Sequence, residues 1–345
     1  MFSKLIGNDH IKEVLQRLLA SQRVPNALLF AGQEGIGKKR FALELAKSIV
    51  CQNPKNSEAC DECASCRRSD KFTFPKSDDR DAFKKVIFSE HPDIGLVIPY
   101  NKNILVDAIR DTETQANFRP YEAAARFFIV DDADKMNDSA SNALLKTLEE
   151  PPAVSHIFLV TSRPDALLPT IRSRCQTLRF APIATEAIEN YLVVNRKIAP
   201  DDAALLAKLS NGRLGSAIEN DLEKFKASRA AMLKVLESVL MKTDRADLLR
   251  LSEEMNDAKN KDDFEARLAI LQTLIHDVWA MRNASDAKIL VNIDLLNDLK
   301  KFAERADSRK LSGWLSEIEL LRERLAFNLN RKIAADALFM QMANN

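Results

Sequence analysis

The sequence lacks an excess of charge of either sign. Its 345 residues carry 51 Lys and Arg against 50 Asp and Glu, which gives a formal net charge of +1. Domains that bind nucleic acid mainly through bulk electrostatics have a strong basic excess. That mode of binding is therefore excluded, and any contact with DNA has to be local or shared with partner proteins.

Long apolar runs are absent as well. No stretch approaches the roughly 18 consecutive apolar residues that a membrane-spanning helix needs. The segment Met1–Gln16 has charges every few residues and does not resemble a secretory signal. We therefore expect a cytoplasmic protein without a membrane partner. Histidines are few, and none of the four suggests a metal ligand or a general base: His10, His91, His156 and His276.

The organisation of the chain changes after about residue 181. Its length favours two or three domains of roughly 100–200 residues each. Up to residue 181, short apolar runs alternate with helical patterns, and such runs are typical of strands buried on both faces of a parallel sheet. The first part is therefore predicted to be an α/β, doubly wound domain. The predicted strands are Ala27–Phe30, Ile94–Ile98, Phe127–Val130, Ile157–Val160 and Thr177–Phe180.

Two regions depart from this alternation. The stretch Asp70–Asp93 has mixed charge and no clear period, so we expect a surface insertion there and attach no function to it. From Pro182 onward the pattern predicts successive helices, beginning with Thr185–Val194 and Pro200–Ser210. We expect a small helical domain at 182–224 and a larger helical bundle at 225–345. One apolar helical face is expected to pack in that bundle: Leu311, Leu315, Ile318, Leu321 and Leu325.

A glycine-rich loop follows the first predicted strand. The segment Gly32–Lys39 reads GQEGIGKK and precedes a helical pattern. In this context backbone N–H groups cradle phosphates, and Lys38 reaches the outer ones. Lys39 stands where Ser or Thr would supply a hydroxyl to Mg²⁺, but lysine offers only donors and positive charge. The loop predicts a phosphate site that has lost a metal ligand, with a plain glycine turn as the alternative. Its residues are Gly32, Gly35, Gly37, Lys38 and Lys39.

Two acids follow the predicted strand Phe127–Val130. Asp131 is placed to hold Mg²⁺ through water at the end of a sheet. In active ATPases with such a phosphate loop, the residue after this aspartate is usually glutamate. Asp132 stands there instead, and its side chain is one methylene shorter than that of glutamate. A misplacement of about 1 Å can cost roughly 10²-fold in rate, so weak or absent hydrolysis is expected. Two solvated acids that cap the following helix remain the alternative.

Five cysteines are present, and four of them are clustered. In the cytosol thiols stay reduced, so disulfides are not expected. Cys51, Cys60, Cys63 and Cys66 lie within 16 residues, and this spacing matches a tetrahedral structural zinc site. An iron–sulfur cluster is the alternative, since CxxCxxC occurs there too. Cys175 is expected to be an ordinary buried residue.

The order of further motifs resembles a known family across essentially the whole chain. The segment Asn142–Pro152 reads NALLKTLEEPP, and Ser173-Arg174-Cys175 follows it. This pair is similar to the signature of bacterial clamp-loader AAA+ subunits. The cysteines and the triplet Asn328-Leu329-Asn330 before the last predicted helix belong to the same pattern. The resemblance implies an AAA+ P-loop sheet domain at 1–181 with a zinc module at 51–66, a small helical lid at 182–224 and an all-α collar at 225–345.

Within that family the chain resembles the non-motor, delta-prime class rather than the gamma/tau motors. The motor loop ends in GKT where this chain has Lys39. The motors also place a nucleotide-sensing arginine where this chain has Gly215. Asp132 is a third departure. The nucleotide site implied by the resemblance also includes Thr161, and whether it still holds ATP or ADP without hydrolysis is left open.

The resemblance also implies partners. It predicts a five-subunit ring with gamma/tau and delta subunits that loads the sliding clamp onto primed DNA. Arg174 matches the arginine that completes a neighbour's ATP site in trans, and a solvated loop arginine is the alternative. Two other functions remain open. One is an active gamma/tau-type ATPase, and the other is a zinc-containing interaction module of another DNA-repair assembly.

Overall fold

The chain folds into two units that are discontinuous in sequence. In this computed structural model the described residues are 1–242, 245–255, 264–283, 290–324 and 330–344. The first unit comprises Met1–Lys197 and Ser210–Ile218, and the second comprises Ile198–Leu209 and Glu219–Asn345. The chain therefore passes between the units more than once.

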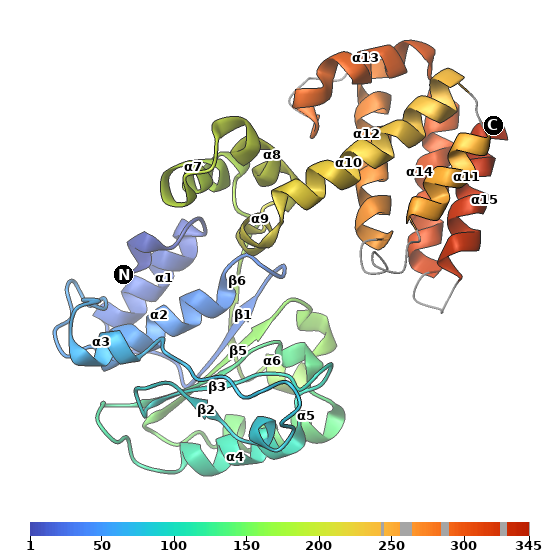
Figure 1. Ribbon diagram of the computed structural model, residues 1–345. Coiled ribbons are helices and arrows are strands. Elements are labelled where there is room, and N and C mark those ends of the chain that lie inside the picture. The colour runs from blue at the N-terminus through green and yellow to red at the C-terminus, as the bar shows by residue number, and fades with distance from the viewer. Residues whose placement is uncertain (243–244, 256–263, 284–289, 325–329, 345) are drawn as a thin grey trace. The chain divides into compact units, whose positions relative to one another are not determined.

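A six-stranded sheet forms the centre of the first unit, in the order β2-β3-β4-β5-β1-β6 (Figure 1). All neighbouring strands pair in parallel except β2, which is antiparallel to β3. The prediction of an α/β parallel sheet is confirmed, and the predicted strands differ from the observed ones by at most two residues at either end. The strands are β1 (Ala27–Ala31), β2 (Ile87–Phe88), β3 (Ile94–Val97), β4 (Arg126–Val130), β5 (Ser155–Thr161) and β6 (Gln176–Arg179).

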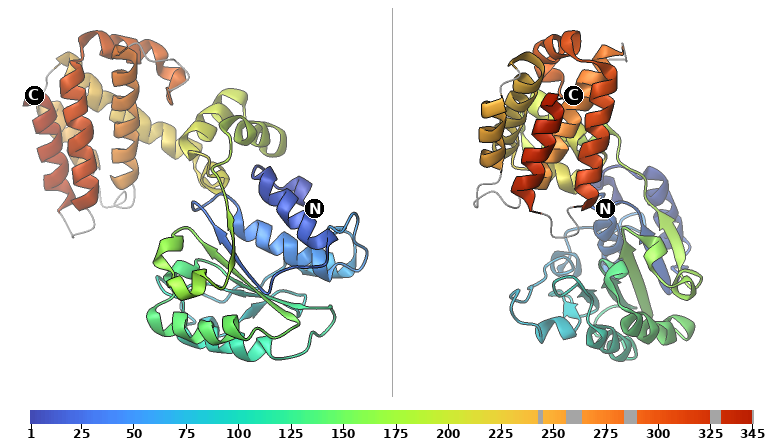
Figure 2. Two further views of the ribbon diagram at one scale, coloured as in Figure 1. Left: turned by 180° about the vertical axis from the view of Figure 1, so that it is seen from behind. Right: turned by 90° about the vertical axis from the view of Figure 1, so that its right-hand side faces the viewer.

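Helices cover both faces of this sheet. Leu28 and Phe30 of β1 belong to an apolar cluster shared with α1 and α2, whereas Leu29 belongs to a cluster shared with α4 and α5. This alternation follows from the period of two in a strand. Figures 1 and 2 show α1 and α2 on one side of the sheet and α4 and α5 on the other. These helices are α1 (Asp9–Ala20), α2 (Lys38–Val50), α4 (Val106–Ala116) and α5 (Asp138–Glu149).

The prediction of a surface insertion at Asp70–Asp93 is wrong for its second half. This half contains the 3₁₀ helix η2 (Ala82–Lys84) and the edge strand β2. Phe83 and Val86 are buried there, and Val86 contributes to the core on the α4 side of the sheet. The elements are too short to produce a recognisable period, so the sequence pattern did not reveal them.

Asp93 connects the end of this segment to the strand beside it. Its side chain is fully buried, with the Nε atom of Arg126 at 3.6 Å. Arg126 is also buried, and its guanidinium lies over the ring of Phe128. The Asp93 carboxylate therefore balances a buried cation and fixes the loop before β4. It also accepts three successive backbone N–H groups at 2.8–2.9 Å, from Tyr121, Glu122 and Ala123.

Shorter elements connect the strands, and three helices follow the sheet. The predicted helix at Pro200–Ser210 is confirmed as α8, and the helix predicted at Thr185–Val194 extends to Arg196 as α7. The division into a lid at 182–224 and a collar at 225–345 stays a prediction. The elements are η1 (Phe2–Lys4), α3 (Ala64–Arg68), η3 (Ala133–Lys135), η4 (Pro164–Ala166), α6 (Pro169–Arg172), α7 (Thr185–Arg196), α8 (Pro200–Ser210) and α9 (Leu214–Glu219).

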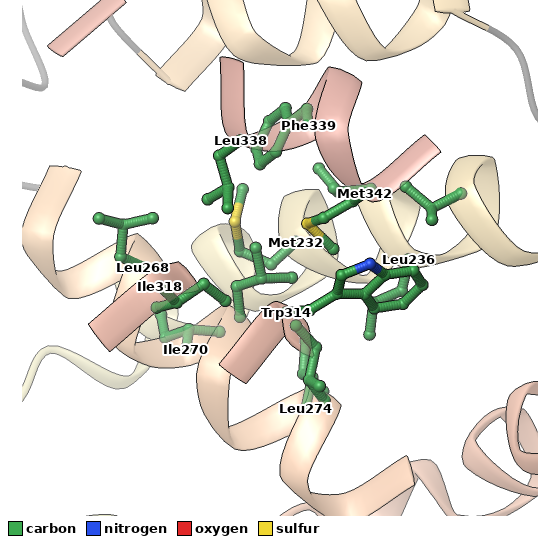
Figure 3. Packing of buried hydrophobic residues seen from close by; sticks show 14 of the residues in the cluster. Met232, Leu236, Leu268, Ile270, Leu274, Trp314, Ile318, Leu338, Phe339 and Met342 are labelled. Atoms are coloured by element: carbon green, nitrogen blue, oxygen red, sulfur yellow. The ribbon is translucent and has the colours of Figure 1, made fainter. Parts of the chain in front are cut away.

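The second unit is helical in the part of the chain that the structure describes. Figure 3 shows its apolar core, where Trp314 and Ile318 of α14 pack with residues of α10, α12 and α15. No helix among the described residues is long and apolar enough to span a membrane. The elements are α10 (Leu222–Glu237), the π-helix η5 (Ser238–Lys242), α11 (Arg245–Met255), α12 (Phe264–Arg282), η8 (Ile293–Leu295), α13 (Leu296–Arg305), α14 (Ser308–Arg324) and α15 (Arg331–Asn344).

The predicted apolar face of α14 packs in this core. Leu311 and Ile318 are fully buried, and Leu315 and Leu321 are partly buried against the same cluster. Leu325 lies outside the described residues, as do Asn328 and Leu329. Asn330 does begin the last helix as predicted, because its side-chain oxygen accepts the N–H groups of Lys332 and Ile333.

We expect Asp93→Ala to lower the free energy of unfolding by about 3–5 kcal/mol, because it leaves the buried Arg126 without its carboxylate partner. Urea unfolding of the purified variant measures this loss. Asp78→Ala is the matched control, since Asp78 is exposed and lies in the same segment. Equal stability of the two variants would contradict a structural role for Asp93.

Candidate functional site

The predicted phosphate loop at Gly32–Lys39 connects β1 to α2. Gly32 follows the strand, and its N–H donates to the carbonyl of Thr161 at 3.2 Å. Gly35 (φ +77°) and Gly37 (φ +96°) adopt left-handed conformations that residues with a side chain rarely adopt. Gly37 directly precedes α2, so the first N–H groups of this helix lie beside the loop. Glycine at these two positions therefore permits a loop conformation that other residues would rarely adopt.

Both lysines after the loop contact protein groups. The Lys38 side chain is buried, and its Nζ donates to the carbonyl of Gln33 at 2.6 Å. Burial lowers the pKa of Lys38 and outweighs the opposing effect of nearby acids, chiefly Asp131. Lys39 comes next on α2, and its Nζ lies 2.8 Å from Oδ2 of Asp131. The charge of Lys39 is thus directed at the predicted metal ligand.

The two predicted acids after β4 are both ion-paired. Asp131 lies beside the ammonium group of Lys39, as described above. Asp132 has a left-handed backbone (φ +52°), and its Oδ2 lies 2.8 Å from Nζ of Lys135. Each carboxylate is therefore neutralised by a lysine, and Asp132 is paired within its own loop. This arrangement differs from one in which the two acids share a metal ion and a water molecule.

A third acid, Asp134, was missed by the sequence reasoning. It accepts the hydroxyl of Thr161 at 2.7 Å and the Nε–H of Arg163 at 3.0 Å. Burial opposes its ionisation, but the hydrogen bonds from Thr161 and Arg163 prevail and lower the pKa of Asp134. Thr161 therefore uses its hydroxyl to hold Asp134. The proximity of Asp134 to the first two acids was the only available signal.

The start of α9 contacts the phosphate loop directly. The N–H of Gly215 donates to the carbonyl of Gly35 at 2.7 Å. A Cβ at Gly215 would lie 3.1 Å from both the Cα and the carbonyl oxygen of Gly35. Any side chain at this position would therefore have to displace the loop backbone. By the family resemblance, Gly215 also stands where the motor subunits have a nucleotide-sensing arginine.

Arg174 lies at the surface between α6 and β6. Its Nη2 lies 2.7 Å from Oε1 of Glu149 at the end of α5, and its Nη1 donates to the carbonyl of Thr170 at 3.0 Å. The Arg174 side chain is 35% exposed and that of Glu149 is 50% exposed. The guanidinium group is thus held by two partners and remains partly accessible to solvent.

The four clustered cysteines come together between the end of α2 and α3. Their Sγ atoms all lie within 4.8 Å of one another, with Cys51 and Cys63 at 4.0 Å and Cys60 and Cys66 at 3.9 Å. Burial opposes ionisation of Cys63, but backbone N–H donors and neighbouring thiols lower its pKa to about 6. The cluster could bind a metal ion. Cys175 is buried as predicted, and burial raises its pKa to about 12.

Ion pairs anchor the cysteine segment to the first unit. Asp61 contacts Nζ of Lys47 at 2.7 Å and Nζ of Lys4 at 2.5 Å. Burial opposes ionisation of Asp61, but these lysines lower its pKa strongly. Arg68 at the end of α3 makes a bidentate pair with Glu122, at 3.1 and 2.5 Å. These partners are distant in sequence, so no local pattern predicts them.

We expect Gly215→Ala to lower the free energy of unfolding by about 1–3 kcal/mol, because the added methyl group forces the Gly35 backbone to move. Gly313→Ala is the matched control. No atom lies within 4 Å of a Cβ at that position in α14, so alanine is expected to stabilise the helix by roughly 0.5–1 kcal/mol. Urea unfolding of both variants measures the difference, and a neutral Gly215→Ala would contradict the close approach.

Two family models match most of the chain. The family model described as "DNA polymerase III, delta subunit" matches residues 7–80 and 76–184, and that of "DNA polymerase III, delta subunit, C terminal" matches residues 223–342. The chain is 29% identical to DNA polymerase III subunit delta' of Bacillus subtilis, covering 93% of this chain and 91% of that protein.

Two further proteins are similar to the chain. The Escherichia coli subunit delta' is 29% identical, with 95% of this chain and 92% of that protein covered. For a DNA polymerase III gamma subunit-related protein of Thermotoga maritima, the structural comparison has a TM-score of 0.41 at 20% identity, covering 96% of this chain and 98% of that one. From the two family models together, the chain belongs to the DNA polymerase III delta-subunit family, whose clamp-loader AAA+ members its motifs resemble.

Proposed function

We propose that this protein is the non-motor, delta-prime type of subunit in the bacterial DNA polymerase III clamp loader. In this role it helps to load the sliding clamp onto primed DNA in the cytoplasm. Its partners are gamma/tau and delta subunits in a five-subunit ring, and it reaches the clamp and DNA through that ring. The observation that carries the proposal is the match over almost the full length of two relatives named delta'.

The site geometry supports a subunit that does not hydrolyse ATP. Lys39 pairs with Asp131, where a motor subunit would hold Mg²⁺. Asp132 pairs with Lys135 and so is not positioned as the base or orienter of a water molecule. Gly215 supplies no guanidinium to sense nucleotide. Three residues that ATP hydrolysis requires are thus replaced in one site. The phosphate loop nevertheless retains a backbone that could hold ATP or ADP.

Mixing the protein with delta and gamma/tau subunits tests the proposal, and mass measurement should find all three in one ring. Failure to join this ring would contradict the proposal and favour the alternative of a zinc-containing interaction module in another DNA-repair assembly.

The isolated protein should show no ATP turnover above background. Steady-state phosphate release at saturating Mg-ATP measures this, with a gamma/tau motor subunit as the positive control. Lys39→Thr alone should not restore turnover, because Asp132 and Gly215 remain and residues that act as one unit seldom contribute additively. Turnover of about 1 s⁻¹ or more, a typical enzyme rate, would instead support the active gamma/tau-type ATPase.

The cysteine cluster fits zinc by its geometry. Four thiolates around zinc, each at about 2.3 Å, form a tetrahedron with S–S separations near 3.8 Å. The separations of 4.0 Å for Cys51–Cys63 and 3.9 Å for Cys60–Cys66 are close to this value, and all four Sγ atoms lie within 4.8 Å of one another. Backbone N–H groups also point at the sulfur atoms, for instance that of Cys63 at Cys60 Sγ at 3.3 Å. Bound zinc would tie the end of α2 to α3.

Purified protein should contain one zinc ion, as measured by elemental analysis. Cys63→Ser should reduce the zinc content, whereas Cys175→Ser is the matched control and should leave it unchanged. Removal of zinc should increase hydrogen exchange in residues 51–66 and leave the sheet largely protected, because the free energy of zinc binding is coupled to local folding. Bound iron, or no metal at all, would contradict the zinc assignment.

Arg174 is proposed to act in trans on the ATP site of a neighbouring motor subunit. A guanidinium group stays protonated and can contact two phosphate oxygens at once, so it stabilises the charge that develops during phosphoryl transfer. Its partial exposure and its position on a surface loop are compatible with reaching a neighbour. Glu149 contacts Nη2 and the Thr170 carbonyl contacts Nη1, and these partners hold the guanidinium group at the surface of the subunit.

We expect Arg174→Ala to leave the ring assembled but to reduce DNA-stimulated ATP hydrolysis partially. Loss of such an arginine costs about 10³–10⁵-fold at one site, and the other motor sites are unaffected. Clamp loading should fall further, because it needs all sites. The stability change should stay within about 1 kcal/mol, since Glu149 is a surface partner. Arg172→Ala, which removes a neighbouring surface pair with Asp165, is the control. Equal rates for both variants would contradict the proposal.

A further inference from the structure

Lys39 occupies the position of a metal ligand and also carries the charge of a cation. It is the second residue of α2, directly after the phosphate loop. Its ammonium nitrogen lies 2.8 Å from Oδ2 of Asp131, whose side chain is 17% exposed. Asp131 is itself fixed at the end of β4, because its N–H donates to the carbonyl of Val97 at 2.9 Å. The ion pair thus bridges the start of α2 and the end of β4.

The acids around this pair are also matched by fixed cations. Asp132 lies 2.8 Å from Lys135, and Asp134 lies 2.9 Å from Nη2 of Arg163. Lys38 is held by a loop carbonyl. Each of the three acids after β4 therefore has its own basic partner. A divalent ion would have to compete with a positive charge at every one of these carboxylates.

Mg²⁺ does not fit the residues present here. It requires near-octahedral oxygen ligands at about 2.0–2.1 Å and gives up its water reluctantly. Lys39 supplies no lone pair when protonated, and its charge repels a second cation at short range. Asp131, the predicted metal ligand, is already in contact with that charge. The expected metal of an AAA+ site and the observed side chains are therefore incompatible.

We propose that Lys39 is a built-in replacement for the divalent ion, whose ammonium group joins α2 to β4 and excludes Mg²⁺ from the site. This inference rests on the proposed non-motor function and deepens it. The protein keeps a cation between the phosphate loop and Asp131, but this cation is covalently attached. The loop therefore keeps its position relative to β4 whatever the concentration of divalent ions.

Binding of Mn²⁺ to the isolated, zinc-loaded protein tests this inference, because Mn²⁺ prefers oxygen ligands and is visible by electron paramagnetic resonance. Wild-type protein should bind no Mn²⁺ at this site. Lys39→Thr removes the ammonium and adds a hydroxyl, so it should raise the Mn²⁺ affinity by about tenfold or more. Asp131→Asn in the same background should abolish the gain. Lys84→Thr is the matched control and should resemble wild type, because the pair of Lys84 with Asp81 is not part of this site.

Three results would overturn the inference: Mn²⁺ binding by wild type that Asp131→Asn removes, no gain in Lys39→Thr, or equal gains in Lys39→Thr and Lys84→Thr. Circular dichroism checks that each variant is folded. If Lys39→Thr unfolds, Lys39→Met removes the charge at similar length and allows the same comparison. Failure of the proposed function would appear instead as absence from the clamp-loader ring, so the two failures are distinguishable.

Discussion

Parallel pairing of β1 with its neighbours is the constraint on which the site depends. Because parallel strands end at a common edge, the loop after β1, the acids after β4 and Thr161 of β5 are brought together from distant parts of the chain. The strands are held in this register by apolar side chains packed on both faces. The ion pair between Lys39 at the start of α2 and Asp131 after β4 is thus a consequence of how the sheet brings these two segments together.

Much of the fold was predictable because its signals are local. Buried parallel strands leave continuous apolar runs, and glycine spacing and cysteine spacing are visible within a few residues. The edge strand Ile87–Phe88 was missed because two residues cannot show a period. Long-range polar contacts were missed for a different reason. Neither the pairing of Asp93 with Arg126 nor that of Asp61 with Lys47 leaves a pattern near either partner.

The candidate site was predictable in its residues but not in their partners. The sequence identified Lys39, Asp132 and Gly215 as departures from an active ATPase, because each lacks a group that such an ATPase has: a hydroxyl, a glutamate and a sensing arginine. The structure adds what each residue does instead: Lys39 and Asp132 form ion pairs, and Gly215 supplies a backbone hydrogen bond to the loop. A family can thus keep a fold while its chemistry changes.

The discontinuous division of the chain affects how it can be cut. Passages between the two units fall after Lys197, after Leu209 and after Ile218. A single proteolytic cut at any one of them leaves the units joined by the other two passages. A fragment that ends at Lys197 also lacks Gly215 and its hydrogen bond to the phosphate loop, whereas a fragment that begins at Glu219 lacks α8. Neither unit therefore corresponds to one continuous stretch of the polypeptide.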